Sequence, residues 1–416
     1  MPIEGVVLQL KAMRLQHVVN FPFPTPPDRR SIATAEKMLQ YLSAITPSGQ
    51  ATQIGSTMAK FPLPPRFARI LLIGHLHDCL PYTVALVAGL SVAEIFIPES
   101  QAVPALAPEA EQQQQQYGFR TNVEVAAETQ QAQARKCYNE AHRNFRSLDD
   151  ASDAVKLLQA VGEFAHDPSE AWCERHFVRF KALQEAQKLR RQITSLLAKD
   201  IPAFANLIFR EKLGRPTPKQ VVALKQMVAA GFVDQVAIRA DLAPVPPSEL
   251  MYRKPRRAID VPYVPLQPIH QHGRGGGSGG DDEEDKAVYI HPSSVLAHFS
   301  PQECPEYVVY AGLQRAAAVV DPATGATRRP KTRMLALTDV TGAQLAGLAK
   351  GTPLLSYGKP IKEVLVSGST GDDAKNLRDC WVVPYLRAEG TGGQGWPLPV
   401  AKVRQRKVAG KGWVVE

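Results

Sequence analysis

The sequence predicts an α+β multidomain protein with a winged-helix unit, an all-helical middle domain and a small C-terminal β-domain. A chain of 416 residues exceeds what one hydrophobic core normally serves, so several compact units are expected. Helical spacing of apolar residues prevails up to about residue 240, whereas short strand-like runs prevail after residue 286. Stretches rich in proline and glycine lie between these two regions and separate the helical domains from the β-rich one.

The first predicted domain is winged-helix-like and covers residues 1–65. A short helix is expected within residues 3–19, and the proline cluster FPFPTPP ends it because proline lacks an amide hydrogen. A second helix is expected over residues 31–42, where apolar residues recur at helical spacing. A short strand and another short helix follow within residues 50–61, which completes the order helix, helix, strand and helix.

A helical domain with one insertion is predicted over residues 66–240. The run from 66 to 97 is apolar nearly all round, which is typical of helices buried on several sides. From about 98 to 148 the composition changes to glutamine, alanine and glutamate, with five consecutive glutamines. This stretch is predicted to be a low-complexity insertion, partly disordered or loosely helical. Helical patterns then resume over residues 153–164, 169–198 and 218–231.

The remainder of the chain is predicted to hold a disordered linker, a β-domain and a basic tail. Residues 241–286 combine the basic run YRKPRR, the glycine run GRGGGSGG and the acidic run DDEED, and no hydrophobic core can form from them. Short strands bounded by turn residues predict a small barrel or sandwich over residues 287–390. Residues 391–416 are expected to form a basic tail, because the last sixteen residues carry five cations and one carboxylate.

The net charge of +9 favours an anionic partner, and nucleic acid is the commonest one for a protein of this kind. The five cysteines lie too far apart for a zinc ribbon or a redox pair, so reduced, buried thiols are expected. No segment has the pattern of a signal peptide or the apolar length of a membrane span. The sequence therefore predicts no membrane partner and a nuclear or cytoplasmic compartment.

No catalytic and no metal-binding residue is predicted for this chain. The phosphate-binding pattern GxxxxGK[ST] is absent, the acidic run DDEED lies in the predicted linker and makes no acidic box for magnesium, and it follows the glycine run with charges that repel phosphate. His75 and Cys79 could share an ion on one helix face, but a third ligand is lacking, which favours simple packing. His291 and Ser293 have no acid partner or nucleophile elbow beside them, so a hydrolase is unsupported.

Four stretches, in this order, resemble the C-terminal half of the DEAH-box RNA helicases. They are VVLQLKAM with NFPFPTPP and GQATQIGSTMAKFPLPPRFARIL, then AWCERHFVRFKALQEAQKLRRQI, then VVALKQMVAAGF, and finally VYIHPSSVL with YVVYAGL and MLALTDV. The resemblance covers about residues 3–97, 150–240 and 286–355. His176 stands where the family usually has asparagine, and the strand MLALTDV lacks the family's arginine, although Arg333 precedes it.

The resemblance implies a winged helix, a helical ratchet-like bundle and a C-terminal OB-type β-barrel, which together roof a channel for single-stranded RNA. The family's motor domains, which hydrolyse ATP with magnesium, are expected immediately before residue 1. The chain itself is therefore expected to hold no cofactor and to be inactive alone. The connector FPFPTPP, the insertion and the basic end look most like the nucleolar subgroup acting in small-subunit ribosome biogenesis. This likeness implies pre-ribosomal RNA and a ribosome-assembly protein cofactor as partners, in the nucleus and nucleolus.

An RNA grip of this kind needs cations for phosphates and planar groups for bases. Each candidate also has a simpler interpretation: ion pairing with Glu174 or Glu185 for the helical arginines, a core position for the barrel tyrosine, and solubility for the tail. The candidates are Arg179, Arg190 and Arg191 in the helical domain, Tyr310, Arg315 and Arg333 in the barrel, and Lys402, Arg404, Arg406, Lys407 and Lys411 in the tail.

Three other functions stay open on the sequence alone. The chain could be a non-enzymatic ribosome-assembly scaffold that mainly docks proteins, or a fragment of a splicing-type DEAH helicase. A winged-helix DNA-binding regulator ranks last, because the helix from Ile32 to Leu42 offers only Lys37 to the phosphates.

Overall fold

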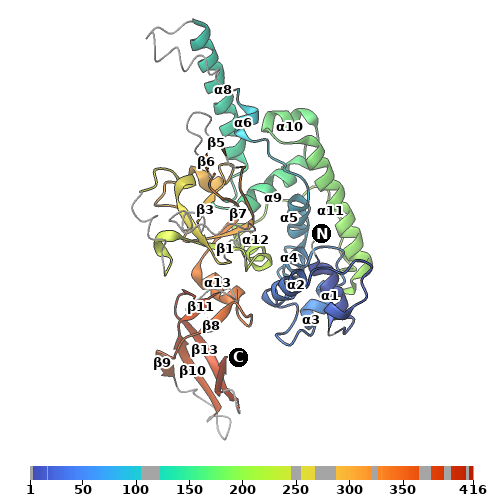
Figure 1. The fold of residues 1–416 in the computed structure, drawn as a ribbon. Helices are drawn as coiled ribbons and strands as arrows, with labels where there is room; N and C mark the ends of the chain where they lie inside the picture. Colours follow the sequence, from blue (N-terminus) through green and yellow to red (C-terminus); the bar gives the residue numbers. More distant parts are fainter. Residues whose placement is uncertain are drawn as a thin grey trace. The chain divides into compact units, whose positions relative to one another are not determined.

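The structure is a computed structural model that divides into two compact units (Figure 1). Unit 1 comprises Met1–Arg69, Ala229–Ile290 and Ser300–Glu416, and unit 2 comprises Ile70–Val228 and His291–Phe299. The glutamine run, most of the predicted linker and Lys411 lie outside the described residues. The structure describes residues 3–15, 17–104, 122–244, 254–267, 287–317, 319–320, 327–328, 330–364, 376–387, 395–408 and 412–415.

The N-terminal part of unit 1 contains the predicted helices, but the short strand predicted after residue 50 is not formed, because Ile45 and Ala51 make only an isolated β-bridge. Its helices are α1 (Glu4–Ala12), α2 (Arg29–Tyr41) and α3 (Gln53–Met58), with the 3-10 turn η1 (Val18–Asn20) after α1. The third helix begins at Gln53, where the Thr52 hydroxyl caps it by accepting the amide of Gly55 at 2.9 Å. A Cβ at Gly55 would lie 1.9 Å from the carbonyl oxygen of Ala44, so only glycine fits there.

The barrel of unit 1 is a ring of five strands in the order β1-β2-β3-β7-β4. All neighbours pair antiparallel except β3 and β7, which pair parallel. Tyr263 and Tyr307 are at most 2% exposed, and the centre of the Tyr307 ring lies 6.2 Å from that of the Trp396 ring. The strands are β1 (Val236–Arg239), β2 (Pro262–Pro265), β3 (Val288–Ile290), β4 (Tyr307–Gln314) and β7 (Arg333–Val340).

The barrel begins before the limit predicted for it. Strand β1 lies inside the predicted helical domain, and strand β2 with the 3-10 turn η5 (Ala258–Asp260) lies inside the predicted linker of residues 241–286. Strands β1 and β2 are four residues long and η5 is three. Because β2 begins and ends with proline, the sequence alone does not distinguish it from an extended linker. The linker prediction is therefore wrong for residues 254–267.

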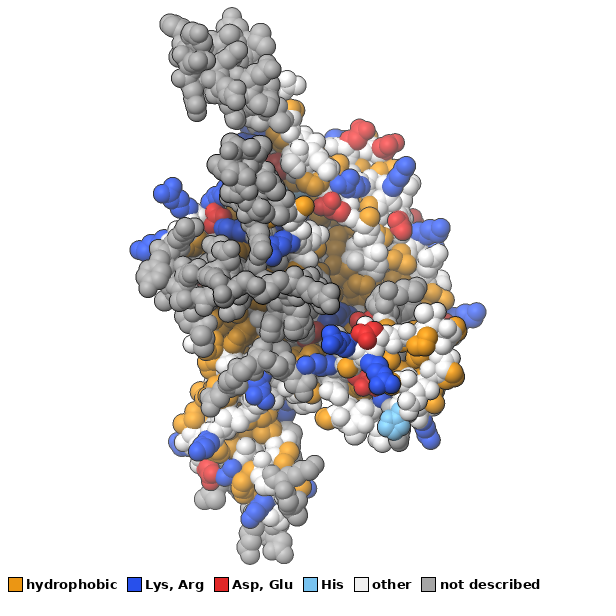
Figure 2. Space-filling model, viewed as in Figure 1, with side chains coloured by type: hydrophobic (Ala, Val, Ile, Leu, Met, Phe, Trp, Pro, Cys, Tyr) orange, Lys and Arg blue, Asp and Glu red, His pale blue; other side chains and the backbone are white. Residues whose placement is uncertain are grey.

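The end of unit 1 is a β-structure rather than the predicted basic tail (Figure 1). One sheet has the order β12-β11-β8 and a second has the order β14-β13-β10-β9. Figure 2 shows cationic and apolar side chains together over this part of the chain. The strands are β8 (Leu355–Tyr357), β9 (Lys362–Val364), β10 (Leu377–Val382), β11 (Pro384–Leu386), β12 (Trp396–Pro397), β13 (Ala401–Val408) and β14 (Gly412–Val415).

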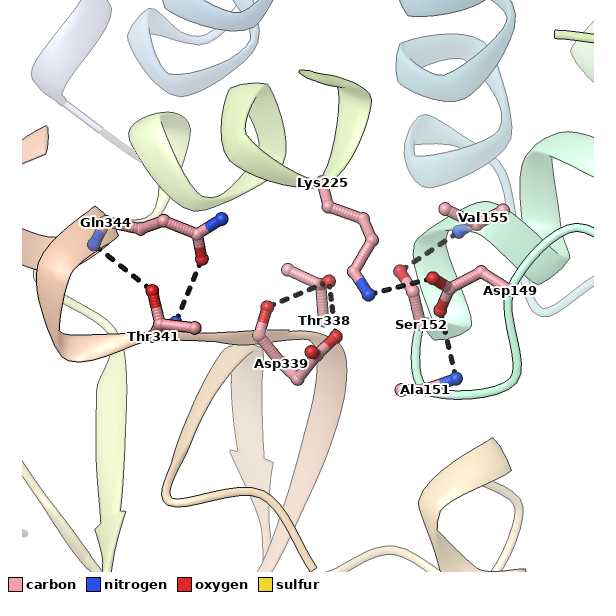
Figure 3. Close-up of polar contacts among 9 residues, drawn as sticks. All are labelled: Asp149, Ala151, Ser152, Val155, Lys225, Thr338, Asp339, Thr341 and Gln344. Atoms are coloured by element: carbon pink, nitrogen blue, oxygen red, sulfur yellow. Dashed lines mark hydrogen bonds and ion pairs between the residues drawn. The ribbon is translucent and has the colours of Figure 1, made fainter. Parts of the chain in front are cut away.

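Helix α13 (Gly342–Leu348) leads from the barrel toward these sheets along the chain. Its start is a capping box, in which the Thr341 hydroxyl accepts the amide of Gln344 and the Gln344 side chain accepts the amide of Thr341 (Figure 3). Two backbone donors at the helix start are thereby satisfied. A small two-stranded ribbon, β5 (Val319–Val320) with β6 (Thr327–Arg328), completes the described β-structure of unit 1.

Unit 2 is helical, as predicted. One expected helix, over residues 169–198, is divided because Phe177 adopts a left-handed φ of 54° and ends the first half. The insertion after residue 98 contains the long helix α8. The helices are α5 (Leu80–Ser91), α6 (Glu99–Ala102), α8 (Asn122–Asn144), α9 (Asp153–Phe164), α10 (Glu170–His176) and α11 (Phe180–Asp200), with α4 (Pro65–Leu76) and α12 (Pro218–Gly231) shared with unit 1 and the 3-10 turns η2 (Pro202–Phe204) and η8 (Val295–His298).

Polar contacts fix the loop that precedes α9 in unit 2. Asp149 accepts the Lys225 ammonium at 2.8 Å and the amide of Ala151 at 2.9 Å, and the Ser152 hydroxyl caps α9 at the amide of Val155 (Figure 3). At the same helix start, Asp153 accepts the hydroxyl of Ser294 at 2.5 Å and the amide of Val295 at 2.9 Å. The segment around η8 is thereby held on unit 2.

A buried ion pair joins the winged helix to the barrel within unit 1. Arg66, at the start of α4, donates to both carboxylate oxygens of Asp234 at 2.5 and 2.9 Å and to the carbonyl of Gly231 at 3.1 Å. Gln267 also donates to Asp234, and the Arg66 guanidinium lies over the ring of Phe232. The Asp234 side chain is 3% exposed, so its charge depends on these donors for stabilisation.

Replacing Asp234 by asparagine should therefore destabilise the protein. The substitution leaves the Arg66 charge buried without its counterion, at a cost of about 3 kcal/mol. Urea unfolding followed by circular dichroism measures the change. Asp241→Asn is the matched control, because Asp241 pairs with Arg239 at the surface and its loss should cost about 1 kcal/mol or less. Equal effects of the two substitutions would contradict the structural role of the buried pair.

Unit 2 buries a histidine next to a lysine. His142 is 5% exposed, its Nδ1 lies 3.2 Å from the Lys156 ammonium, and its ring stacks on Tyr138. Because an ammonium only donates, His142 Nδ1 must accept, and the imidazole is neutral. Burial and the nearby Lys156 charge lower the pKa of His142 to about 3. Burial also lowers the pKa of Lys156 to about 8, against the raising effect of Asp153.

Acid should therefore weaken unit 2 through His142. The unfolded chain takes up a proton near the ordinary histidine pKa while the folded chain does not, so stability falls as the pH drops from about 6.5 toward 3. At pH 5 the loss from this one residue is about 2 kcal/mol relative to pH 7. Thermal unfolding of His142→Phe should show a correspondingly smaller fall between pH 7 and 5, whereas Tyr138→Phe should keep the wild-type pH dependence. An unchanged pH dependence in His142→Phe would refute this.

Candidate nucleic-acid interface

A basic corner of the barrel gathers around one carboxylate and one tyrosine. Asp260, in η5, accepts Arg257 at 3.0 Å and Lys331 at 3.2 Å. The Lys331 ammonium lies 4.3 Å from the centre of the Tyr289 ring, and the Arg333 guanidinium lies 5.7 Å from the same centre. We call these five residues the barrel corner. It brings three cations together against one acid.

The cations of the barrel corner differ in exposure. The Arg257 and Lys331 side chains are 68% and 43% exposed, so both can reach a ligand in solvent. Arg333 is half-buried and donates to the carbonyls of Ile259 at 2.5 Å and Ile290 at 3.1 Å, and burial lowers its pKa. Although partial burial opposes it, hydrogen bonds from Arg257 and Lys331 hold the pKa of Asp260 below its usual value.

Further exposed cations extend this positive surface along the chain. They come from the segment before η5 and from the end of β4, and they are Lys254, Arg256 and Arg315. Arg315 also donates through Nε to the carbonyl of Pro330 at 3.1 Å. Arg257 was not predicted as a binding residue, because it belongs to the run YRKPRR that was interpreted as linker. Lys331 and Tyr289 were not predicted either, because their contacts with Asp260 and with each other join segments far apart in the sequence.

Two of the predicted barrel residues differ from expectation. Tyr310 is 4% exposed, which places its ring in the core rather than on a stacking surface. Burial and the charge of Asp234 raise the pKa of its hydroxyl. The binding interpretation of Tyr310 is therefore wrong and the core interpretation holds. Arg333 stays beside the barrel corner, where its carbonyl contacts make it chiefly a residue that positions η5 and β3.

Arg190 is buried, contrary to the prediction of a surface cation. It is 2% exposed and donates to the carbonyls of Arg210 at 3.0 Å and Glu211 at 3.3 Å and to the Gln187 side chain. Burial lowers its pKa to about 10, partly opposed by the charge of Glu211, so it remains charged at neutral pH. Its guanidinium holds the segment after α11 instead of meeting a phosphate.

The other two helical candidates lie nearer the surface. Arg191 is exposed, with its guanidinium 5.2 Å from the centre of the Phe209 ring. Arg179 is 39% exposed and pairs with Glu94 at 3.3 Å, so the ion-pair interpretation holds for it with a different acid from the one expected. Arg179 and Arg190 share no exposed face, because Arg190 is buried.

Substitution of Arg190 should destabilise the protein much more than substitution of its neighbour Arg191. Arg190→Met leaves two carbonyls unpaired in the interior and should cost about 2 to 4 kcal/mol of stability. Arg191→Met should change the stability by less than about 0.5 kcal/mol, because exposed substitutions are usually mild. Thermal denaturation of the two variants measures both effects. If Arg190→Met unfolds at the wild-type temperature, its carbonyl contacts do not stabilise the segment.

The predicted tail cations lie on strand β13. Lys402 and Arg404 pair with Asp379 of β10 at 3.2 and 2.9 Å, and Arg406 and Lys407 are exposed. Lys411 lies outside the described residues. The cations that were predicted to form a basic tail are thus part of a strand.

Packing explains the pair that had invited a metal hypothesis. The His75 ring lies edge-on to Phe204 at 4.5 Å between centres, and Cys79 is 1% exposed. Within the described part of the chain, no group of three or more His, Cys, Asp or Glu side chains is arranged to hold a metal ion. The same described residues contain no helix that is long and apolar enough to cross a membrane.

Comparison with protein families places all three domains. Residues 35–63 match a family described as the winged-helix part of the helicase-associated domain HA2, and residues 64–157 match its ratchet-like part. Residues 224–351 match an oligonucleotide/oligosaccharide-binding (OB) fold family. The last match begins before β1, in agreement with the barrel limits in the structure. The predicted fold class is confirmed.

Curated relatives agree with this domain set. A protein of Schizosaccharomyces pombe named as a candidate ATP-dependent RNA helicase is 32% identical over 99% of this chain. The probable ATP-dependent RNA helicase DHR1 of Saccharomyces cerevisiae is 31% identical over the whole chain, and the probable ATP-dependent RNA helicase DHX37 of Homo sapiens is 32% identical over 74% of it. The chain spans 31%, 32% and 24% of these three relatives.

The fold is that of a region built from the winged-helix and ratchet-like helicase-associated domains and an OB-fold domain. The chain belongs to the DEAH-box RNA helicases and represents the C-terminal, helicase-associated part of the nucleolar-type subgroup that includes DHR1 and DHX37.

Proposed function

We propose that this chain is the RNA-binding accessory region of an ATP-dependent RNA helicase that remodels pre-ribosomal RNA during small-subunit maturation. The barrel corner is the observation that carries the proposal. It presents the exposed cations Arg257 and Lys331 on a barrel of the oligonucleotide-binding type. Single-stranded RNA, helicase motor domains and a ribosome-assembly protein are its proposed partners, in the nucleolus.

Physical chemistry favours binding through the RNA backbone at this surface. Cations that replace counterions on phosphates give sequence-independent affinity that falls steeply with salt. Asp260 does not cancel this effect, because one carboxylate faces two exposed cations and the half-buried Arg333. The Tyr289 ring is 6% exposed, so it supports Lys331 from below and is not itself a stacking surface.

ATP hydrolysis belongs, in this proposal, to motor domains that act on the same RNA. The sequence contains no GxxxxGK[ST] loop to hold the phosphates and no DEAH motif to hold magnesium. The accessory region would contribute grip on the strand while the motor moves it. ATP and magnesium are accordingly proposed as ligands of the motor and not of this chain.

The test measures binding of the purified chain to a fluorescent single-stranded RNA across a salt series. Wild-type affinity should fall linearly on a log–log plot. Arg257→Ala with Lys331→Ala should weaken binding and lower the slope by about 0.7 for each phosphate that the variant no longer neutralises. The same preparation should release no phosphate from ATP in the presence of magnesium.

Lys60→Ala provides the matched control, because Lys60 is an exposed cation of the winged-helix part. It should leave both affinity and salt slope close to wild type. Absence of RNA binding by the wild-type chain, together with strong binding to ribosome-assembly proteins, would replace this proposal with the scaffold function. ATP hydrolysis by the chain alone would also refute it.

A further inference from the structure

The sheet β14-β13-β10-β9 has one face with an exposed tryptophan between cations. Residues directly opposite each other in antiparallel strands point to the same face. Trp381, on the inner strand β10, lies opposite Lys362 of β9 and Lys402 of β13. Asp379 lies opposite Arg404, and Leu377 lies opposite Arg406. We call the surface formed by Lys362, Trp381, Lys402, Arg404 and Arg406 the Trp381 face.

The Trp381 face is open to solvent. The Trp381 side chain is 40% exposed, and the side chains of Lys402 and Arg404 are 50% and 52% exposed. Lys362 and Arg406 are exposed as well. Tryptophan side chains are mostly buried in folded proteins, because apolar surface left in contact with water is unfavourable. A flat ligand that stacked on the Trp381 ring would remove this apolar surface from water.

The opposite face of the same sheet is buried around Cys380. Cys380, Val382 and Gln405 are at most 5% exposed there. Trp413, which points to that face, is covered by the Arg378 guanidinium at 4.2 Å. By contrast, among the described residues the Trp381 ring has no aromatic or cationic group stacked on it. The two tryptophans of this sheet thus have different roles, one internal and one available.

Charge selects the partner class. Among the four strands, Asp379 is the one carboxylate on the Trp381 face, and its side chain is 14% exposed between Lys402 and Arg404. Hydrogen bonds from Arg404 and Lys402 hold its pKa below the usual value. The exposed Trp381 ring is therefore surrounded by four solvent-facing cations and by one carboxylate, Asp379, whose charge is balanced by its ion pairs. A flat base with a phosphate on either side matches this pattern, whereas an acidic protein surface would leave the ring unstacked.

We propose that the Trp381 face binds single-stranded RNA, with a base stacked on Trp381 and the flanking phosphates on Lys362 and Lys402. The site lies outside residues 224–351, which match the OB-fold family, so it is separate from the barrel corner. The inference rests on the proposed RNA-binding function but adds a second contact. Stacking on an aromatic ring tolerates any base, so the preference is for single strands rather than for a sequence.

The experiment uses the full 416-residue chain and a fluorescein-labelled oligouridine of about twelve nucleotides, with anisotropy as the readout. Trp381→Leu keeps an apolar side chain but removes the stacking plane, and it should weaken binding about 10-fold, while Trp381→Phe should retain most of the affinity. Tryptophan emission should be quenched on RNA addition in wild type and much less in Trp381→Leu. Lys362→Ala should lower the salt slope by about 0.7.

Two control variants distinguish loss of the Trp381 face from a general effect on folding or on net charge. Leu76→Ala removes an apolar side chain that is 73% exposed in unit 2, and Lys350→Ala removes an exposed cation after α13. Both should bind RNA as wild type does. Circular dichroism should show that the Trp381 variants keep the wild-type spectrum and unfolding temperature.

Failure of this inference differs from failure of the proposed function. If wild type binds the oligouridine but Trp381→Leu binds equally well, the Trp381 face is not an RNA site while the accessory function stands. Equal affinity for a fully paired RNA duplex would also overturn the inference, because paired bases cannot stack on the ring. If wild type binds no RNA, both proposals fall together.

Discussion

A buried ion pair between Arg66 and Asp234 holds the two parts of unit 1, the winged helix and the barrel, together. Arg66 opens α4 and Asp234 comes just before β1, so the pair ties the end of the winged helix to the first strand of the barrel. Taking two charges out of water is expensive, and bidentate geometry together with Gln267 and the Gly231 carbonyl offsets that cost. The barrel ring, and with it the barrel corner, follows from where β1 is held.

Charge in this protein is divided between holding the fold and meeting solvent. Arg66, Arg190 and Lys156 are largely buried and satisfy carbonyls, carboxylates or ring faces inside the units. Lys331 and Arg404 use the same chemistry at the surface, where a carboxylate holds part of each side chain and leaves the rest open. The net charge of the whole chain is therefore not the charge of its surface, because the buried arginines and lysine also contribute to it.

The sequence predicted the domain order and the helical or strand character of most elements, because their apolar periodicity is long and regular. It did not predict β1 and β2, because each is only four residues long. It did not predict β13, because the buried position 405 holds the polar Gln405 where an amphipathic strand usually has an apolar residue. Arg190 and Tyr310 were assigned to the surface because residue type alone does not reveal which way a side chain points. Trp381 escaped notice because its cationic neighbours are on other strands.

The alternation along β13 has a consequence for how this surface can evolve. Lys402, Arg404 and Arg406 share one side of the sheet because they are two residues apart, while Val403 and Gln405 point to the other. Loss or gain of a single residue within β13 would exchange the two rows over the rest of the strand and turn the cations inward. Spacing along β13 is thus under tighter restraint than composition, because lysine and arginine carry the same charge at one position whereas a shift by one residue reverses the direction of every side chain after it.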